Sequence, residues 1–519
     1  MLPLKHGPEA SRLRRKFERA FALGALFCLL AGCARDPLLP RAAEPVVILP
    51  REVDELDPRF VGDAYGLKLS RLLYASLVTI DPRTLSPVLD LAESFTIEQP
   101  LRYRVVMKRG LRFADGSALD AHDVVATFQA LVDPRVMSRY RSTYERVKRV
   151  WAEGDLTVVF ELSEPNATFM TDLEIPVLRS QDAFQPRAHD RLPVASGPYL
   201  LRRRDKSALT LDPNPHHHTA RAARPALRFV IVRDDNVRAL RMLAAGGDLA
   251  QSVLPHLLLP LFEARDDLHV LSTPGAGTSY IGINLTHPVL RDVRVRTALA
   301  HALDRQRLVT FKLGGRASLA SSWIPRGHWA HAADTPNYAF DPAQARALLQ
   351  AAGVVPLHLV MRTSSDRGIV SVARAMASML ADVGIELEVR PSETATLLSD
   401  LARGRFELSL LQVPEVFEPN VLSWFFASDR IPEAGVREGG NRFRLRDTRL
   451  DHLLLAGRQE LDQARRAAIY RDVQHLLARE LPVIPLWHED VVAVVSRRMF
   501  DYEVPRDARF GTLAQSAAR

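Results

Sequence analysis

The second half of the chain alternates between two spacings of apolar residues. Behind Asp292 the apolar positions lie three and four residues apart, as on one face of a helix: Val295, Ala298, Leu299, Ala302 and Leu303. Residues 341–353 predict a further helix, with Asp341 as its N-cap and Gly353 as its stop. Residues 385–390, IELEVR, alternate apolar and charged side chains, which is typical of a half-buried strand.

Helix, glycine and strand follow one another twice between residues 372 and 413. Repeated αβ units joined by short loops favour a parallel sheet with right-handed crossovers. Earlier, residues 103–132 predict a strand, a turn and a helix that begins behind Asp120. No low-complexity linker and no repeat of fixed period separates these segments. We therefore expect an α/β fold whose lobes are interleaved along the chain.

The N-terminus has the pattern of an export signal. The first 20 residues carry six Lys or Arg and two Glu, and an apolar run of ten residues, 21–30, follows them. Ten residues are too few to span a bilayer, which needs roughly 20. Leu30-Ala31-Gly32-Cys33 resembles the lipobox of bacterial lipoproteins, which implies that residues 1–32 are a signal peptide and that Cys33 is acylated. The alternative is an ordinary signal peptide followed by a chance cysteine.

Composition removes several classes of function. Cys28 and Cys33 are the only cysteines of the chain, so the part that follows Cys33 can form neither disulfides nor Cys-based metal sites. The net charge is +8, of which the first 20 residues supply 6 − 2 = +4, and the remaining +4 is no nucleic-acid footprint. No P-loop, HExxH or GxSxG motif occurs, which weakens the case for an enzyme.

Several phrases of the sequence resemble one family, the solute-binding proteins of ATP-driven peptide importers. Residues 103–128, YRVVMKRGLRFADGSALDAHDVVATF, are similar to its F-x-L-R-x-G-V-x-F-x-D-G … A-x-D-V signature. Residues 290–309, LRDVRVRTALAHALDRQRLV, are similar to its V-R-x-A-x-x-x-A-x-D-R phrase. ELDPRFVGDAYGL, ASGPYLL and YIGINL follow in the family's order, and the resemblance runs from about residue 46 to 505.

The resemblance implies a two-lobed, type II periplasmic-binding-protein clamp with an additional inserted α/β domain. Lobe I would comprise residues 33–62, 190–283 and 482–519, and the inserted domain II residues 63–189. Lobe II would comprise residues 284–481. Two connections would let the lobes close on a ligand in the cleft between them.

The function implied is capture of peptides and their delivery to an inner-membrane permease with its ATPase subunits. We expect no enzymatic turnover, no cofactor, no nucleic-acid partner, a monomer, and a periplasmic location with a lipid anchor in the membrane. An alternative within the same fold is binding of nickel complexes or another small solute. A lipid-anchored sensor or chaperone, or a hydrolase, is the more distant alternative.

The resemblance also points to residues of the binding site. In relatives that bind peptides, an aspartate just before an E-P or D-P pair holds the terminal ammonium group. Here LLQVPEVFEPN places Glu415 at that position, with Gln412 and Val413 just before it and Gln412 where relatives carry an aromatic residue. The alternative for Glu415 is a solvated loop carboxylate. The other candidates for lining the cleft, or else for core or surface roles, are Gly62, Asp63, Ala64, Tyr65, Tyr140 and Tyr144.

Residues 216–218 are three consecutive histidines, and histidine is the commonest metal ligand. Three adjacent side chains in a loop cannot all point at one ion. We therefore predict a solvated loop at this point and no metal site.

Overall fold

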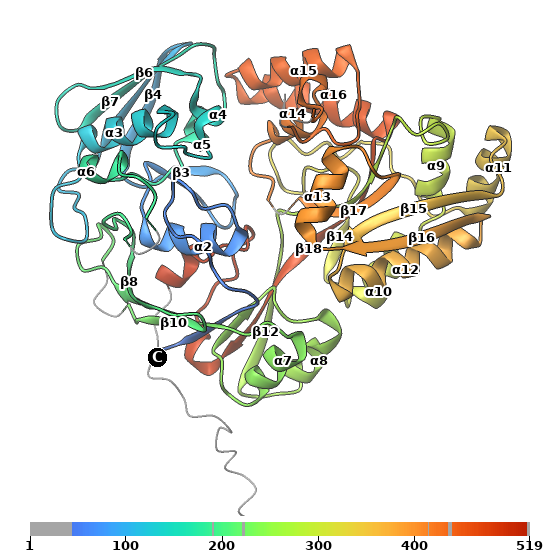
Figure 1. Cartoon of the computed structure of the whole chain (residues 1–519), viewed down its shortest axis with the longest axis horizontal. Coiled ribbons are helices and arrows are strands. Elements are labelled where there is room, and N and C mark those ends of the chain that lie inside the picture. The colour runs from blue at the N-terminus through green and yellow to red at the C-terminus, as the bar shows by residue number, and fades with distance from the viewer. Residues whose placement is uncertain (1–43, 189–190, 221–223, 414, 434–438, 516–519) are drawn as a thin grey trace, which may run out of the picture.

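A computed structural model describes residues 44–515, except 189–190, 221–223, 414 and 434–438. Its largest sheet has the strand order β16-β15-β17-β13-β18-β11-β1-β10-β9-β8, with β12 and β14 also paired to β18. A four-stranded sheet, β4-β5-β7-β6, and a two-stranded sheet, β2-β3, are separate from it. Figure 1 shows three bodies around a central crossing strand, and each has its own buried core.

Lobe I holds one end of the large sheet, and its strands bury nearly continuous apolar runs such as VVIL at Val46–Leu49. Its strands are β1 Val46–Leu49, β8 Tyr199–Arg204, β9 Ala208–Pro213, β10 Leu227–Ile231, β11 Leu249–Gln251 and β12 Leu268–Pro274. Its helices are α2 Ala64–Leu73, α7 Asp235–Leu243, η2 His256–Leu258, α8 Leu259–Glu263, η4 Arg497–Met499 and η5 Gly511–Ala514. Helix α2 packs in this core, although the predicted boundary at residue 63 assigns it to domain II. Strand β13, Thr278–Ile283, pairs with β17 of lobe II, although the predicted boundary at residue 283 assigns it to lobe I. The boundaries themselves stay a prediction.

Domain II is an antiparallel sheet covered by helix α3. Its strands are β2 Val78–Ile80, β3 Pro87–Leu89, β4 Ala92–Gln99, β5 Arg102–Met107, β6 Val147–Ala152 and β7 Thr157–Leu162. Its helices are α3 Ala121–Val132, α4 Arg141–Tyr144, α5 Phe169–Asp172 and α6 Ser180–Ala183. The predicted N-cap is confirmed: Asp120 and Asp123 form a reciprocal capping box at the start of α3.

Lobe II contains the αβ units predicted from the spacing of apolar residues. Its strands are β13 Thr278–Ile283, β14 Ala317–Leu319, β15 Leu357–Ser364, β16 Ile385–Ser392 and β17 Leu408–Val413. Its helices are α9 Val293–His301, α10 Arg305–Lys312, α11 Pro342–Ala352, α12 Arg367–Ala381, α13 Thr394–Ala402, α14 Val421–Phe426, η3 Ser428–Arg430, α15 Thr448–Gln459 and α16 Gln463–Glu480. Strands β15, β16 and β17 are parallel as predicted, whereas β13 is antiparallel to β17 and β18, so the sheet is mixed.

Strand β18, Val483–Ser496, joins the two lobes within one sheet. Residues 483–487 pair with β13 of lobe II, and residues 490–496 pair with β12 of lobe I. The second connection is the short link from β12 to β13, where a Cβ atom on Gly275 would lie 2.3 Å from the carbonyl oxygen of Glu489. The two connections between the lobes are therefore in contact at this point. Lobes that are joined by adjacent connections can rotate about them as about a hinge. In the part of the chain that the structure describes, none of the helices combines the length and apolar character needed to cross a membrane.

Candidate functional site at the junction of the three bodies

Arg509 lies where lobe I, domain II and lobe II meet. It belongs to the C-terminal segment that follows β18, and its backbone N–H donates to the side chain of Asp507. Its guanidinium group donates to Glu174, which follows α5 of domain II, with 3.3 Å between Nη2 and Oε2. The same Nη2 atom lies 3.2 Å from Oε2 of Glu415, in the loop behind β17 of lobe II. One buried arginine thus links all three bodies.

The ring of Phe417 covers the guanidinium group of Arg509 at 4.4 Å from its centroid. Cation–π contact of this kind favours Arg, because the planar guanidinium stacks on a ring while its edge donates hydrogen bonds. Phe417 is held by His328, whose Nε2 donates to the Phe417 carbonyl oxygen over 2.9 Å. The loop that carries Glu415 is therefore fixed at several points.

The junction contains more acidic than basic groups in direct contact. Burial raises the pKa of Asp507 to about 6, although the charge of Arg509 works in the opposite direction. Burial also tends to raise the pKa of Glu174, but Arg71 and Arg509 outweigh it, so that this pKa is lowered. Burial lowers the pKa of Lys68, partly offset by Glu415. The charges of Glu174, Glu415 and Asp507 raise the pKa of Arg509, although burial acts in the opposite direction.

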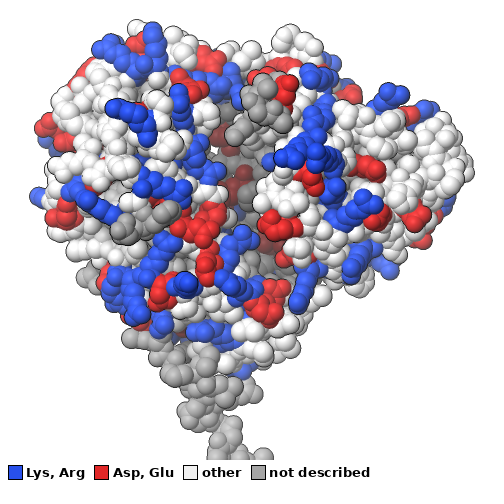
Figure 2. All heavy atoms as spheres, in the orientation of Figure 1, with Lys and Arg blue, Asp and Glu red and all other residues white. Residues whose placement is uncertain are grey.

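A second contact joins domain II to lobe II beside the junction. Glu418 accepts from Nη2 of Arg466 over 3.0 Å and from Oγ1 of Thr171 over 3.1 Å. Arg458 of α15 donates to Glu164 over 3.2 Å, and its carbonyl oxygen accepts the backbone N–H of Ala167. Figure 1 shows α15 and α16 of lobe II beside the helices of domain II. Figure 2 shows a furrow between these two sides of the molecule, with charged side chains along its rims.

Glu415 is the predicted residue that the structure brings to this junction, with its side chain 26% exposed. Gln412 is an exposed residue of β17 opposite Ser279. Val413 is buried and pairs with Thr278, so it supports the strand that precedes the Glu415 loop.

The loop Gly62 to Tyr65 forms the start of helix α2. Asp63 is the N-cap, and its carboxylate accepts from the backbone N–H groups of Tyr65 and Gly66. Ala64 is exposed. The side chain of Arg139 runs over Gly62, where a Cβ atom would lie 2.0 Å from its Nη1.

Tyr65 and Tyr140 are half-buried, whereas Tyr144 lies in the core of domain II. Lys68 lies 5.2 Å from the centroid of the Tyr65 ring. Tyr144 packs edge-on against Phe128 and donates its hydroxyl to the carbonyl oxygen of Asp172. The Tyr144 hydroxyl is therefore used within domain II, and its position supports a core role.

Sequence reasoning missed Arg509, Glu174 and Lys68. Glu174 and Arg509 are 335 residues apart, and Arg509 and Glu415 are 94 apart, so no local spacing relates them. The sequence around Asp507, near the C-terminus, alternates acidic and basic residues. This pattern is too common to predict a binding site.

The three histidines lie in different environments, and His216 is exposed. His217 is buried, which lowers its pKa to about 3, and Nε2 of His218 lies 3.0 Å from the carboxylate of Asp90. The expectation of a solvated loop is thus wrong for His217, because this side chain packs under the turn. Among the residues that the structure describes, no group of His, Cys, Asp and Glu side chains is arranged to hold a metal ion.

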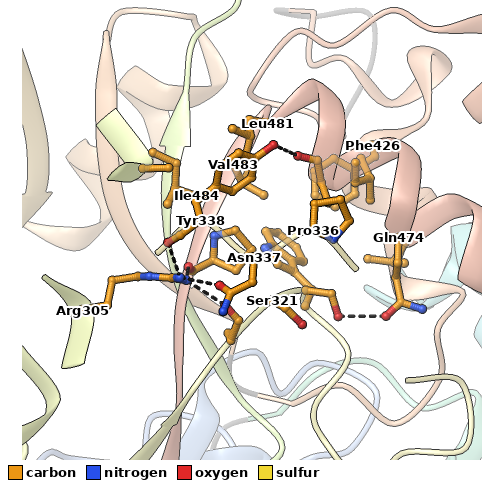
Figure 3. Close-up of a pocket in the computed structure, with 18 residues that line it drawn as sticks. Arg305, Ser321, Pro336, Asn337, Tyr338, Phe426, Gln474, Leu481, Val483 and Ile484 are labelled. Carbon is orange, nitrogen blue, oxygen red and sulfur yellow. Dashed lines mark hydrogen bonds between the residues drawn. The ribbon is translucent and has the colours of Figure 1, made fainter. Parts of the chain in front are cut away.

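A cavity of about 30 Å³ lies inside lobe II, away from the junction. Its wall includes Trp323, Phe426 and Val483, and Figure 3 shows Arg305 bonded to Asn337 and Tyr338 at one end. This volume suits one or two water molecules and is too small for a peptide.

The structure has two α/β lobes that are joined by two segments, and ionised groups of both lobes meet between them. This is the arrangement of a hinged binding protein. Residues 86–431 match the model of the bacterial extracellular solute-binding proteins, family 5 Middle, which is more than half of the chain. The chain belongs to this family.

Relatives and solved structures agree with this assignment. The chain is 28% identical over 467 residues to the probable di/tripeptide-binding protein 5 of Pseudomonas aeruginosa (strain UCBPP-PA14), covering 83% of this chain and 88% of that protein. The oligopeptide-binding protein AppA of Bacillus subtilis, solved with a nonapeptide, has a TM-score of 0.78 at 20% identity, covering 92% of this chain and 98% of that one.

NikZ of Campylobacter jejuni, solved with Ni(L-His), has a TM-score of 0.77 at 22% identity and covers 89% of this chain and 95% of that one. The solved structures confirm the predicted fold, a type II clamp of two lobes.

Proposed function

We propose that this protein is the binding component of an ATP-driven importer and that it captures short peptides between its lobes. The observation that carries the proposal is the position of Glu415 at the junction. Its Oε2 is bonded to Arg509, and Oε1 has no partner among the residues that the structure describes. An acidic oxygen in a closing cleft suits the α-ammonium group of a peptide. The di/tripeptide-binding relative from P. aeruginosa supports this ligand class.

The remaining groups of a bound peptide would be met by general features of the fold. Main-chain N–H and C=O groups pair with exposed backbone in the manner of β-augmentation, which does not depend on sequence. Glu415 of lobe II already contacts Arg509 of lobe I in this arrangement, so a peptide held here is shielded from water, which strengthens each charged contact. Gly62, Asp63, Ala64, Tyr65, Tyr140, Gln412 and Val413 stay predicted neighbours of the ligand.

The members of this family are solute-binding proteins. We extend this to the absence of turnover here, so that the bound peptide leaves unchanged to a membrane permease driven by ATPase subunits. The lipobox-like phrase at Leu30 to Cys33 supports a lipid anchor on the outer side of the membrane, and we expect a monomer. Residues 1–43, with Cys33, lie outside the described part of the chain.

A nickel complex is the second candidate ligand, because NikZ of C. jejuni shares the fold. Such a ligand would carry its metal already coordinated by its own donor groups. The protein would then need only side chains whose charge is opposite to that of the complex. Calorimetry with nickel and L-histidine, measured beside peptides, separates the two candidates.

The test of the proposal is the variant Glu415→Gln, which keeps the shape of the side chain and removes its charge. Truncating one member of a desolvated ion pair costs about 2 to 5 kcal/mol, so the affinity for dialanine falls by roughly 30-fold or more. N-acetyl-dialanine, which has no ammonium group, binds weakly and is hardly affected. Isothermal titration calorimetry measures both constants.

Glu386→Gln is the matched control, because Glu386 is an exposed glutamate of β16 in the same lobe. It should leave both affinities unchanged. If Glu415→Gln weakens both peptides equally, or neither of them, Glu415 is not the ammonium site.

A further inference from the structure

Arg509 holds Glu415 by only one of its two carboxylate oxygens. The contact of 3.2 Å runs from Nη2 to Oε2, and the side chain of Arg509 is 7% exposed. We propose that Arg509 is a positioning residue of the ligand site, which fixes Glu415 so that Oε1 faces the ligand's ammonium group. This proposal rests on the proposed function and names the residue that makes Glu415 selective.

The geometry shows why Arg509 cannot simply neutralise Glu415. Its guanidinium group is committed to Glu174 through Nη1 and Nη2, and Glu174 is held in turn by Arg71 over 3.4 Å. The ring of Phe417 covers one face of the guanidinium. Nη2 donates to both Glu174 and Glu415, so both of its hydrogens are used and none is left for the second oxygen of Glu415.

The charges around Arg509 balance one another when every group is ionised. Glu174, Glu415 and Asp507 surround Arg509, with 3.6 Å between Asp507 Oδ2 and Nε of Arg509. Three carboxylates against one guanidinium give −3 + 1 = −2 when all are ionised, and Arg71 brings this to −1. Lys68 of α2 is the further cation, and it acts on Glu415 through space. Lys68 brings the sum to −1 + 1 = 0, so the preference for a ligand ammonium group comes from Oε1 of Glu415, unpaired in the described part of the chain, and not from an acidic surplus.

Lysine cannot replace Arg509 in this arrangement, although it carries the same charge. Its ammonium group is a compact point charge, and it cannot present a fork to Glu174 while it holds Oε2 of Glu415. Arg509→Lys therefore keeps the net charge of the junction and removes the orientation of Glu415. Arg465→Lys is the matched control, because Arg465 is an exposed arginine of α16 that pairs with Glu460 and contacts none of the described charged groups of the junction.

The experiment is calorimetry of the wild-type protein, Arg509→Lys and Arg465→Lys with dialanine and N-acetyl-dialanine. In Arg509→Lys we expect the affinity for dialanine to fall about tenfold while that for the acetylated peptide is unchanged. In Arg465→Lys the ratio of the two affinities should stay within twofold of the wild-type ratio. In the Glu415→Gln background, Arg509→Lys should change the ratio no further.

Equal losses for both peptides in Arg509→Lys, no loss for either, or the same selective loss in Arg465→Lys would each overturn the proposal. A wild-type protein that binds both peptides equally well would instead overturn the assignment of Glu415, and the positioning role with it. If Arg509→Lys does not fold, Glu174→Gln provides the test, since it frees Arg509 to cover both oxygens of Glu415. The affinity for dialanine should then fall selectively, again about tenfold, and an equal loss for both peptides would contradict the proposal.

Discussion

Buried arginines serve two different purposes in this protein. Arg305 donates from Nη1 to the carbonyl oxygens of Ala320 and Pro485, each over 2.9 Å, and burial lowers its pKa. Arg296 likewise donates from Nε and Nη2 to the carbonyl oxygen of Glu480, the last residue of α16. Arg509 has carboxylate partners instead, and its pKa is raised. The first kind satisfies the backbone where a helix or strand ends, and the second kind organises a charged site.

His328 makes the stability of the Glu415 loop depend on pH. Burial lowers the pKa of His328 to about 4, against an ordinary value of about 6.5. Its Nδ1 accepts from the backbone N–H of Ala330, and Nε2 donates to Phe417, so the neutral ring fits the site. Between these two pKa values the unfolded chain binds more protons than the folded one. The stabilisation is therefore complete above pH 6.5 and is lost as the pH falls toward 4.

The variant His328→Gln should remove this part of the acid sensitivity. The shift corresponds to about 3 kcal/mol, so the free energy of unfolding should fall less steeply between pH 6.5 and 4 than in the wild-type protein. Urea unfolding at a series of pH values measures this slope. His488, whose pKa burial also lowers to about 4, should maintain a remaining slope. The exposed His122, changed to Gln, is the control, and identical slopes for His328→Gln and wild type would contradict the prediction.

Among the elements, β18 and the helix pair α15 and α16 decide how the bodies are held together. Strand β18 belongs to both lobes, so it can bend but cannot slide without breaking two sets of strand pairs. Arg458 of α15 donates to Glu164 of domain II. Arg466 of α16 donates to Glu418, which in turn accepts from Thr171 of domain II. The hinge therefore sets the axis about which the lobes rotate. The contact of α15 and α16 with domain II sets how far lobe II can close.

Arg458→Ala should weaken closure without changing selectivity. Arg458 lies 3.1 Å from Glu164, and opening of the hinge must break this contact between lobe II and domain II. A partly buried pair contributes about 1 kcal/mol, so dialanine and N-acetyl-dialanine should both bind about fivefold more weakly, measured by calorimetry. Arg465→Ala removes an exposed arginine of the same lobe, paired with Glu460 and remote from domain II. An equal loss in this control, or a change in the ratio of the two peptides, would count against the prediction.

At the scale of the whole molecule, three cores are tied together by few covalent connections. Residues 75–177 supply most of the core of domain II, and α3 also reaches the core of lobe I through Ala126 and Ala130. This packing makes lobe I and domain II one wall of the furrow, while lobe II forms the other. Closure is then a motion of two walls, although the chain builds three bodies.

Replacement of Cys33 by Ser tests the place of the whole molecule in the cell. Acyl chains contribute about 0.8 kcal/mol per buried methylene, so a lipid-anchored protein stays with membranes and the Cys33→Ser variant should be released from them. Fractionation of cells that express each form measures this, and Cys28→Ser, which changes the cysteine within the predicted leader, is the control. Membrane association that is unchanged in Cys33→Ser would refute the anchor.

The sequence by itself determined the local elements and the family. Caps such as Asp120, Asp292 and Asp341 and the alternation in residues 385–390 depend on near neighbours, and the helices and strands begin where these residues indicate. The order of family phrases likewise lies in the chain itself. Glu415 could be singled out from the sequence because nearby residues, the Glu418-Pro419 pair, define its position.

Only the tertiary structure decided what surrounds Glu415. Arg509 and Glu174 come from opposite parts of the chain, and nothing in their local sequence relates them. The same holds for Tyr144 and His217, which looked like cleft or loop residues but are buried in their own body. Burial disfavours the charged form of each group, and partners that are far apart in the sequence offset this free-energy cost. The fold must therefore be complete before any of these groups acquires its chemistry.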